Sequence, residues 1–313
     1  MKLSIVIPAY NEVANIRFTI NELLSAIEVV LEAANTQIIV VDDHSSDNTF
    51  EAVKNINDAR VICIRLSRRS GSHIAIRAGL RISESDAVLF ISADGQEDIS
   101  CIEAMLSKYR KGAKIIWALR KDRKDEPWHA RKTARIFYTL LNWFDKDKLC
   151  VDELYRADFC LLDREVVNAV NSCNEKNTSI FGLISWLGFE QDFVEYQRKL
   201  RRHGRSKWNF GRRLNLAIDW IVAFSGLPLR LMSIIGTIVA SFGFLYAIFI
   251  IFNMITGNPP EGWTSTMVVI LVVGGVQMMM MGIIGEYLWR NIEESRNRPL
   301  YFVEKDTDKR NNT

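Results

Sequence analysis

Two long stretches of this chain contain no charged residue, and they limit what it can fold into. The first runs from Leu231 to Pro260 and the second from Gly262 to Gly285. Each is longer than the roughly 20 apolar residues that a helix needs to cross a bilayer core. We therefore predict two transmembrane helices, at about 231–255 and 264–287. A buried helical hairpin in a soluble core is the alternative, but such helices normally carry a polar stripe.

The basic residues near these spans predict their orientation. Lys and Arg lie before the first span and after the second, whereas the connecting segment TGNPPEGW has neither. Basic residues favour the cytoplasmic side, so we expect both chain ends in the cytoplasm. No signal-peptide pattern precedes the run LSIVIP. The five cysteines lack CxxC spacing, which favours reduced thiols in a cytosolic compartment over a zinc site or a disulfide framework.

The first two-fifths of the chain repeats short apolar runs separated by helix-length intervals. These runs are at 3–7, 37–41, 61–66, 87–91 and 114–118. Continuous Val- and Ile-rich runs with this spacing predict an α/β domain with a mainly parallel sheet covered on both faces. Ligands bind beyond the carboxyl ends of such strands. Here those ends carry the polar segments PAYNE, DDHSSDNT and SADGQED.

The rest of the chain is less regular. Residues 119–197 are expected to mix helix with an extra strand or two, and 198–213 contain eight Lys or Arg and no acid. Apolar residues at helical spacing follow, which favours an amphipathic helix at the membrane surface over a solvated helix packed on the soluble domain. The tail KDTDKRNNT is expected to be disordered. We therefore divide the chain into a soluble domain at 1–208, an interfacial helix at 209–229, the transmembrane helices within 230–289 and a cytoplasmic tail at 290–313.

The charge pattern and the polar loops narrow the function. A whole-chain balance of 40 basic and 37 acidic residues gives no indication of nucleic-acid binding. Asp94 follows a buried run, where its carboxylate could hold a cation against a diphosphate, although such residues often only cap a turn. Asp42 and Asp43 end another run; one could brace the loop while the other faces a base or ribose, or both could cap backbone amides. GxGxxG and GxxxxGK[ST] are absent, which disfavours dinucleotide oxidoreductases and P-loop proteins.

Six motifs in order carry a family resemblance that covers nearly the whole chain. They are LSIVIPAYNE, VVDDHSSDNT, LSRRSGSHIAIRAGL, ISADGQED, ADFCLLDREVV and GRSKWNF. Together they resemble the family 2 glycosyltransferases of GT-A fold, a Rossmann-like domain. More narrowly, they look like polyprenyl-phosphate glycosyltransferases related to dolichol-phosphate mannose synthase and the bactoprenol glucosyltransferases. The tail with GGVQMMMMGIIGEYLWRNIEESRNRPLY is similar to the bacterial bactoprenol members.

This resemblance implies roles for particular residues. The nucleotide sugar would be bound by Pro8, Tyr10, Glu12, Asp42, Asp43, Ser92 and Asp94. A divalent cation, Mg²⁺ or Mn²⁺, would be held by Asp94 and Gln96. The catalytic residues would be Arg120 at the diphosphate, Lys207, and Asp158 near the transferred sugar. The acceptor phosphate would be met by Arg201, Arg205 and Lys207. The family's metal motif usually reads Asp-x-Asp, whereas the first position here is Ser92, so we expect weaker metal binding or an altered metal preference.

The resemblance implies inverting transfer of a sugar from a nucleotide sugar to a polyprenyl (undecaprenyl) phosphate at the cytoplasmic face of a bacterial inner membrane. We expect glucose from UDP-glucose, while galactose, N-acetylated and amino-arabinose donors stay open. We also expect a homo-oligomer, and a separate flippase and glycosyltransferase acting downstream. Two alternatives stay open. A processive polysaccharide synthase would show a QxxRW motif and more spans, and neither is present. The other is a catalytically impaired membrane scaffold, for which Ser92 in place of the usual aspartate would be the mark of lost activity.

Overall fold

The computed structural model describes residues 1–30, 35–121, 156–176, 178–199, 227–256 and 262–307. These residues fall into two compact units. One contains residues 1–199 together with 299–307, and the other contains 227–298. Of the predicted interfacial helix at 209–229, residues 209–226 lie outside the described residues. Residues 227–229 form the start of a long helix.

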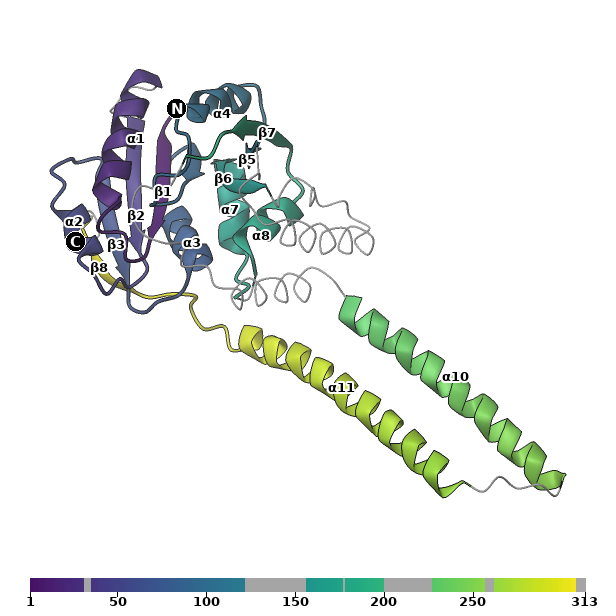
Figure 1. Ribbon diagram of the computed structural model, residues 1–313. Helices are drawn as coiled ribbons and strands as arrows, with labels where there is room; N and C mark the ends of the chain where they lie inside the picture. The colour runs from purple at the N-terminus through teal and green to yellow at the C-terminus, as the bar shows by residue number, and fades with distance from the viewer. Residues whose placement is uncertain (31–34, 122–155, 177, 200–226, 257–261, 308–313) are drawn as a thin grey trace. The chain divides into compact units, whose positions relative to one another are not determined.

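The globular unit is built on one sheet (Figure 1). In the described part of the chain its eight strands follow the order β7-β5-β6-β4-β1-β2-β3-β8. The strands are β1 (Leu3–Ala9), β2 (Thr36–Asp42), β3 (Val61–Leu66), β4 (Ala87–Phe90), β5 (Ile115–Arg120), β6 (Ala157–Asp163), β7 (Gln191–Tyr196) and β8 (Val303–Asp306). The helices of this unit are α1 (Ile16–Val30), α2 (Thr49–Lys54), α3 (Ser72–Ile82), α4 (Cys101–Arg110), α7 (Arg164–Ser172) and α8 (Ile180–Trp186).

The centre of the sheet is parallel, as the apolar runs predicted. β1 pairs in parallel with β2 on one side and β4 on the other, and β2 pairs in parallel with β3. All four residues of β4 are buried, as are six of the seven in β1. Strands buried on both faces read as continuous apolar runs, which is why these five runs could be recognised from sequence.

Two further strands lie in the segment expected to hold an extra strand or two. β6 runs antiparallel between β4 and β5, and β7 pairs in parallel with β5. Because β6 is antiparallel, its amino end lies beside the carboxyl ends of β4 and β5. Residues at the start of β6 therefore reach the same edge of the sheet as the polar loops.

The end of the chain differs from the expected disordered tail. Residues 303–306 form β8, which pairs antiparallel with β3, and only residues 308–313 of the tail lie outside the described residues. The amide of Thr307 also donates to the carbonyl of Cys63 at 3.0 Å. The sequence VEKD has no apolar run, so composition indicated disorder; the backbone groups of the β3 edge provide the pairing that composition cannot show.

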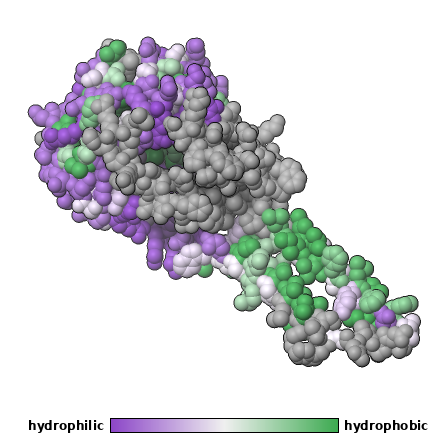
Figure 2. Space-filling model, in the orientation of Figure 1, coloured by the Kyte–Doolittle hydropathy of each residue, from purple (hydrophilic) through white to green (hydrophobic). Residues whose placement is uncertain are grey.

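The second unit consists of α10 (Leu227–Ile255) and α11 (Trp263–Ser295), which contact each other. Both are long and apolar enough to cross a membrane, over Leu231–Asn253 and Val268–Ser295, with mean hydropathy 2.4 and 2.3. Figure 2 shows apolar residues along these helices, whereas the surface of the other unit is largely polar. α11 continues past the predicted end at 287, and an ion pair between Glu286 and Arg290 at 2.9 Å supports its polar last turns.

Candidate active site

Polar side chains from several loops meet at one edge of the sheet. The loops follow the carboxyl ends of β1, β2, β4, β5 and β7, and the first residues of β6 join them. Backbone hydrogen bonds fix neighbouring loops to one another: the amide of Asp43 donates to Ala9, and that of Lys121 donates to Tyr196. This edge is where the fold presents its ligand-binding groups.

The loop after β4 carries the predicted metal residue Asp94. Its carboxylate Oδ1 accepts from the amide of Gln96 at 3.2 Å and from the hydroxyl of Ser92 at 2.7 Å. Gly95 between them has a φ of 67°, a left-handed conformation that glycine adopts without strain. The hydroxyl of Thr19 on α1 donates to the carbonyl of Ala93 at 3.1 Å and holds the loop from the helix side.

Ser92 also lies 2.5 Å from a second carboxyl group, that of Glu97. A hydroxyl has one hydrogen and can donate to only one of these two acceptors, so one carboxyl group must itself carry a proton. Glu97 is only 4% exposed, and burial, followed by the nearby charge of Asp94, raises its pKa to about 7. We therefore place the proton on Glu97, which donates to Ser92, which donates to Asp94. Glu97 Oε2 is buried and has no hydrogen-bond partner among the described residues.

Arg120 and Asp158, both predicted to be catalytic, lie together. Arg120 Nε is 2.6 Å from Asp158 Oδ2, and both side chains are largely buried. The hydroxyl of Tyr196, at the end of β7, donates to the same Oδ2 atom. The carboxylate of Asp158 thus has a guanidinium and a phenol as neighbours. Burial, and next the negative charge of Asp158, raise the pKa of Tyr196 above its usual value, and the charge of Arg120 opposes this shift. These two partners fix the orientation of the Asp158 side chain.

Gln96, the other predicted metal ligand, is engaged by the segment after β7. Its Oε1 atom accepts from Arg198 Nη2 at 2.6 Å, and its carbonyl accepts from the amide of Lys199 at 2.8 Å. The ammonium of Lys199 is paired with Glu22 on α1 at 3.0 Å. The chain leading into the basic segment 198–213 is thereby fastened to the Asp94 loop.

Asp42 and Asp43 both accept hydrogen bonds from backbone amides. Asp42 is fully buried, and its Oδ1 accepts from the amide of Ser45 at 2.9 Å. Asp43 accepts from the amides of Ser70 and Gly71, at 2.6 and 2.8 Å, ahead of α3. Burial outweighs these two hydrogen bonds and raises the pKa of Asp43. Both carboxylates thus accept from loop amides, and contact of either one with a base or ribose stays a prediction.

The residues after β1 lie beside this loop. Pro8 is half-buried within β1, and the guanidinium of Arg69 lies 3.9 Å from the centre of the Tyr10 ring. Glu12 is buried; its amide donates to Thr49 at 3.0 Å and its carboxylate accepts from Asn15 at 2.8 Å. These contacts join the loops after β1 and β2 into one rim. The acceptor-phosphate residues Arg201, Arg205 and Lys207 lie outside the described residues.

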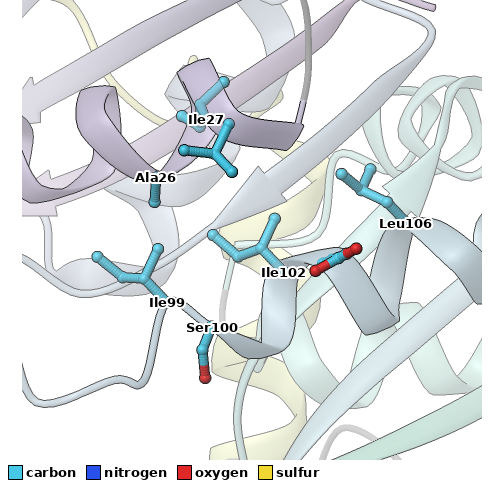
Figure 3. Close-up of a pocket in the computed structure, with 8 residues that line it drawn as sticks. Ala26, Ile27, Ile99, Ser100, Ile102 and Leu106 are labelled. Atoms are coloured by element: carbon cyan, nitrogen blue, oxygen red, sulfur yellow. The ribbon is translucent and has the colours of Figure 1, made fainter.

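An apolar hollow of ≈ 240 Å³ lies between α1 and α4 (Figure 3). Ala26 and Ile27 from α1 line it together with Ile99, Ile102 and Leu106. Ser100 and Glu103 are its polar members. A lining of this kind suits apolar groups and offers no partner for a diphosphate, so we place the candidate site at the polar strand edge and not in this hollow.

Comparison with known proteins identifies the family. Residues 4–168 match the profile of glycosyl transferase family 2, which covers more than half of the chain. The chain belongs to glycosyl transferase family 2. Residues 227–290, which hold α10 and most of α11, match a second profile described as the GtrB C-terminal hairpin.

Full-length relatives of this family 2 member support the assignment. The bactoprenol glucosyl transferase of Shigella phage SfV is 36% identical over 313 residues, covering 99% of this chain and all of that protein. A glycosyltransferase of Synechocystis sp. is 38% identical over 307 residues, covering 97% of this chain and 95% of its own. The resemblance drawn from the six motifs is confirmed, and the protein is a glycosyltransferase that associates with membranes through its hairpin.

The solved structure of mannosyl-3-phosphoglycerate synthase from Rubrobacter xylanophilus is similar in fold, with a TM-score of 0.50 at 19% identity over 74% of each chain. The predicted GT-A fold of this family 2 member is confirmed. Sequence reasoning assigned no role to Glu97 or Tyr196, and it treated Arg198 only as one of the eight cations of 198–213. Tyr196 ends β7 and Glu97 lies in the same polar loop as Asp94, so their places near strand ends were the available signal.

Proposed function

We propose that this protein transfers glucose from UDP-glucose to a polyprenyl phosphate, with inversion at the anomeric carbon. The observation that carries the proposal is similarity over 97% or more of the chain to proteins named bactoprenol glucosyl transferases. Transfer of a sugar to a membrane lipid would use the two parts that this chain has, a family 2 domain and a C-terminal hairpin. The sugar comes to this chain by that similarity, and UDP as the donor nucleotide is our own proposal.

The residues at the strand edge fit a divalent cation, in our proposal. Asp94 and Gln96 carry the oxygen atoms that Mg²⁺ and Mn²⁺ prefer, although Gln96 Oε1 would have to exchange Arg198 for the cation. The buried Oε2 of Glu97 is a further acceptor without a partner among the described residues. No group of three or more His, Cys, Asp or Glu side chains in the described part of the chain is arranged to hold a metal by itself. Diphosphate and water oxygens would therefore complete the coordination. A bound cation would neutralise charge on the departing diphosphate.

The protein's own groups would act by binding and orientation. A phosphate monoester has its second pKa near about 6, so the attacking lipid oxygen is already largely ionised at neutral pH. A strong general base is therefore unnecessary, which agrees with an Asp158 carboxylate engaged by Arg120 and Tyr196. We propose that Asp158 orients the sugar and holds Arg120 in place to stabilise the charge that develops on the diphosphate.

The basic segment and the hairpin would bring the acceptor to the site. Eight cations between residues 198 and 213 attract anionic headgroups, at about 1 kcal/mol for each basic residue near a membrane surface. We propose that Arg201, Arg205 and Lys207 meet the lipid phosphate. We also propose an inner-membrane location with the catalytic unit and both chain ends in the cytoplasm, a homo-oligomer, and a separate flippase and glycosyltransferase that use the product.

A transfer assay tests this function. Membranes containing the protein are incubated with radiolabelled UDP-glucose, Mn²⁺ or Mg²⁺, and undecaprenyl phosphate. We expect a lipid-linked monosaccharide, and we expect Asp94→Ala or a chelator to reduce its formation by on the order of a hundredfold or more, as loss of a main charge-stabilising group does. Asp98→Asn is the matched control, because Asp98 lies on the same loop but caps the amide of Ser100.

The other outcomes are equally informative. A long polymer would indicate a processive synthase. No product with any common nucleotide sugar, together with normal membrane insertion, would indicate the scaffold, and full activity in Asp94→Ala would remove Asp94 from the metal site.

A further inference from the structure

The strand that follows the membrane hairpin is firmly seated on the catalytic sheet. β8 runs beside β3 (Figure 1), and hydrogen bonds extend the pairing at both ends. The amide of Ser67 donates to the carbonyl of Phe302 at 2.9 Å, and the amide of Cys63 donates to the hydroxyl of Thr307 at 2.7 Å. Seven residues separate the end of α11 at Ser295 from the start of β8 at Val303.

A β-bulge in this pairing sets the position of Glu304. Arg65 lies opposite Lys305, and the next residue, Leu66, lies opposite Val303, so Glu304 is the extra residue on β8. Bulges of this kind change the direction of a side chain relative to a regular strand. The carboxylate of Glu304 accepts from Arg65 Nε at 3.1 Å.

Arg65 links this carboxylate to the loop after β2. Its Nη1 donates to the buried carboxylate of Asp42 at 3.2 Å, and its Nη2 donates to the carbonyl of Ser45 at 3.0 Å. Glu304 is therefore one of three acceptors that hold a single guanidinium, whose side chain is only 18% exposed. Three acceptors around this planar group restrict the rotamers of Arg65. Because one acceptor is the carbonyl of Ser45, they also restrict the conformation of the loop after β2.

The same loop forms part of the rim of the candidate site. The hydroxyl of Ser45 accepts from the amide of Asn11 at 2.9 Å, which joins it to the loop after β1. His44 has a φ of 57°, an uncommon conformation for a residue with a side chain. Its Nδ1 atom donates to the carbonyl of Leu66 at 3.1 Å and lies 3.5 Å from the Glu304 carboxylate. Both neighbours come from outside the loop.

We propose that Glu304 is a positioning residue for the donor site. Through Arg65 and His44 it holds the loop at 43–46 in its binding conformation, so the strand after the membrane hairpin supports nucleotide binding. This inference rests on the proposed function, because it takes the loop after β2 as part of the nucleotide-sugar site. Loss of the carboxylate leaves the fold and the reacting groups in place but requires the loop to be ordered when the nucleotide binds, which weakens binding.

The test compares Glu304→Ala and Glu304→Gln with Lys305→Ala in the purified full-length protein in lipid nanodiscs. Lys305 is the matched control, because it lies on the same strand opposite Arg65 but its side chain points to another group. Its Nζ atom lies 5.7 Å from the centre of the Phe50 ring. UDP binding with Mn²⁺ is measured by calorimetry, kcat and KM by the transfer assay, and loop order by hydrogen exchange at residues 43–46.

We expect Glu304→Ala to weaken UDP binding and to raise KM by about fivefold, with kcat unchanged, as loss of one partly exposed charged hydrogen bond would. Glu304→Gln should show a smaller effect, and exchange at 43–46 should be faster in both. Lys305→Ala should resemble the wild type. Equal UDP affinity in Glu304→Ala and wild type, or equal losses in Glu304→Ala and Lys305→Ala, would overturn the inference. Absence of UDP binding by the wild type would instead overturn the proposed function.

Discussion

Ser92 joins two carboxyl groups at the loop after β4. With Asp94 at 2.7 Å and Glu97 at 2.5 Å, its hydroxyl can serve both only if one carries a proton. An aspartate at position 92 would add a third carboxyl group to this space, and the repulsion between the groups would have to be relieved by a cation or by further protons. Serine leaves a single negative charge on this trio before a cation binds.

Glu97→Gln tests the proton on Glu97. The pKa of Glu97 rises from 4.5 to about 7, chiefly because of burial. A raised pKa means that the folded protein holds a proton that the unfolded chain has released, so this contribution to stability is lost as the pH rises through about 7. Between about pH 5.5 and about pH 8 the wild type should lose about 2 kcal/mol that Glu97→Gln retains.

Thermal unfolding of the full chain in detergent with a chelator, at both pH values, provides the measurement. Glu103→Gln, which changes an exposed glutamate on α4, should follow the wild type. An equal difference between Glu97→Gln and wild type at both pH values would show that Glu97 does not hold the proton.

Sequence reasoning located these residues better than it assigned their contacts. Asp42, Asp43 and Asp94 could be placed at the edge because each ends or follows an apolar run. Which atoms their oxygens accept from could not be predicted: Asp43 bonds to amides 27 and 28 residues further along the chain. Such partners depend on how loops pack after the sheet has formed, and no local pattern encodes them. The same holds for the approach of Tyr196 to Asp158.

At the scale of elements, the approach of α3 to β1 depends on Gly79. A Cβ atom at this position would lie 2.3 Å from Val6 Cγ1, in a strand residue with no exposed surface. Gly79→Ala should therefore destabilise the protein by about 1–3 kcal/mol, despite the better helix propensity of alanine. Val6→Ala in the same chain removes the contacting methyl groups, so the double variant should lose less stability than the sum of the two single changes.

Chemical denaturation of the four proteins completes this cycle. Strict additivity of Val6→Ala and Gly79→Ala would mean that the helix shifts away from the strand and that the close approach is not required.

The elements show where sequence patterns succeed and where they fail. Continuous apolar runs marked β1 to β5 because these strands are buried on both faces. The insertion of β6 between β4 and β5 was not predictable, since an apolar run does not specify its neighbours or direction. The prediction missed β8 for another reason. An edge strand buries few side chains, so VEKD has no apolar run that would mark it. Its position depends on backbone pairing with β3.

At the scale of the whole molecule, the two units differ in the surroundings that suit their surfaces. The globular unit buries its apolar side chains in a sheet, whereas α10 and α11 expose theirs, from Ile234 and Phe242 to Val268 and Ile284. A surface of this kind is stable only in an apolar medium. The hairpin profile and the exposed apolar surface thus both indicate that the second unit associates with a membrane.

The flanking charges predict the orientation of the hairpin, and this prediction can be measured. Arg212, Arg213 and Arg230 precede the first span and Arg290 follows the second, while 257–262 has no basic residue. Because basic flanks are retained in the cytoplasm, a fluorescent protein fused to the C-terminus should fluoresce, and alkaline phosphatase inserted after Pro259 should be active outside the cytoplasm. Adding three lysines to the connecting segment should lower that phosphatase activity, since the charge difference that orients the hairpin is then reduced. An active phosphatase at the C-terminus would place the catalytic unit on the wrong side of the membrane for a cytosolic nucleotide sugar.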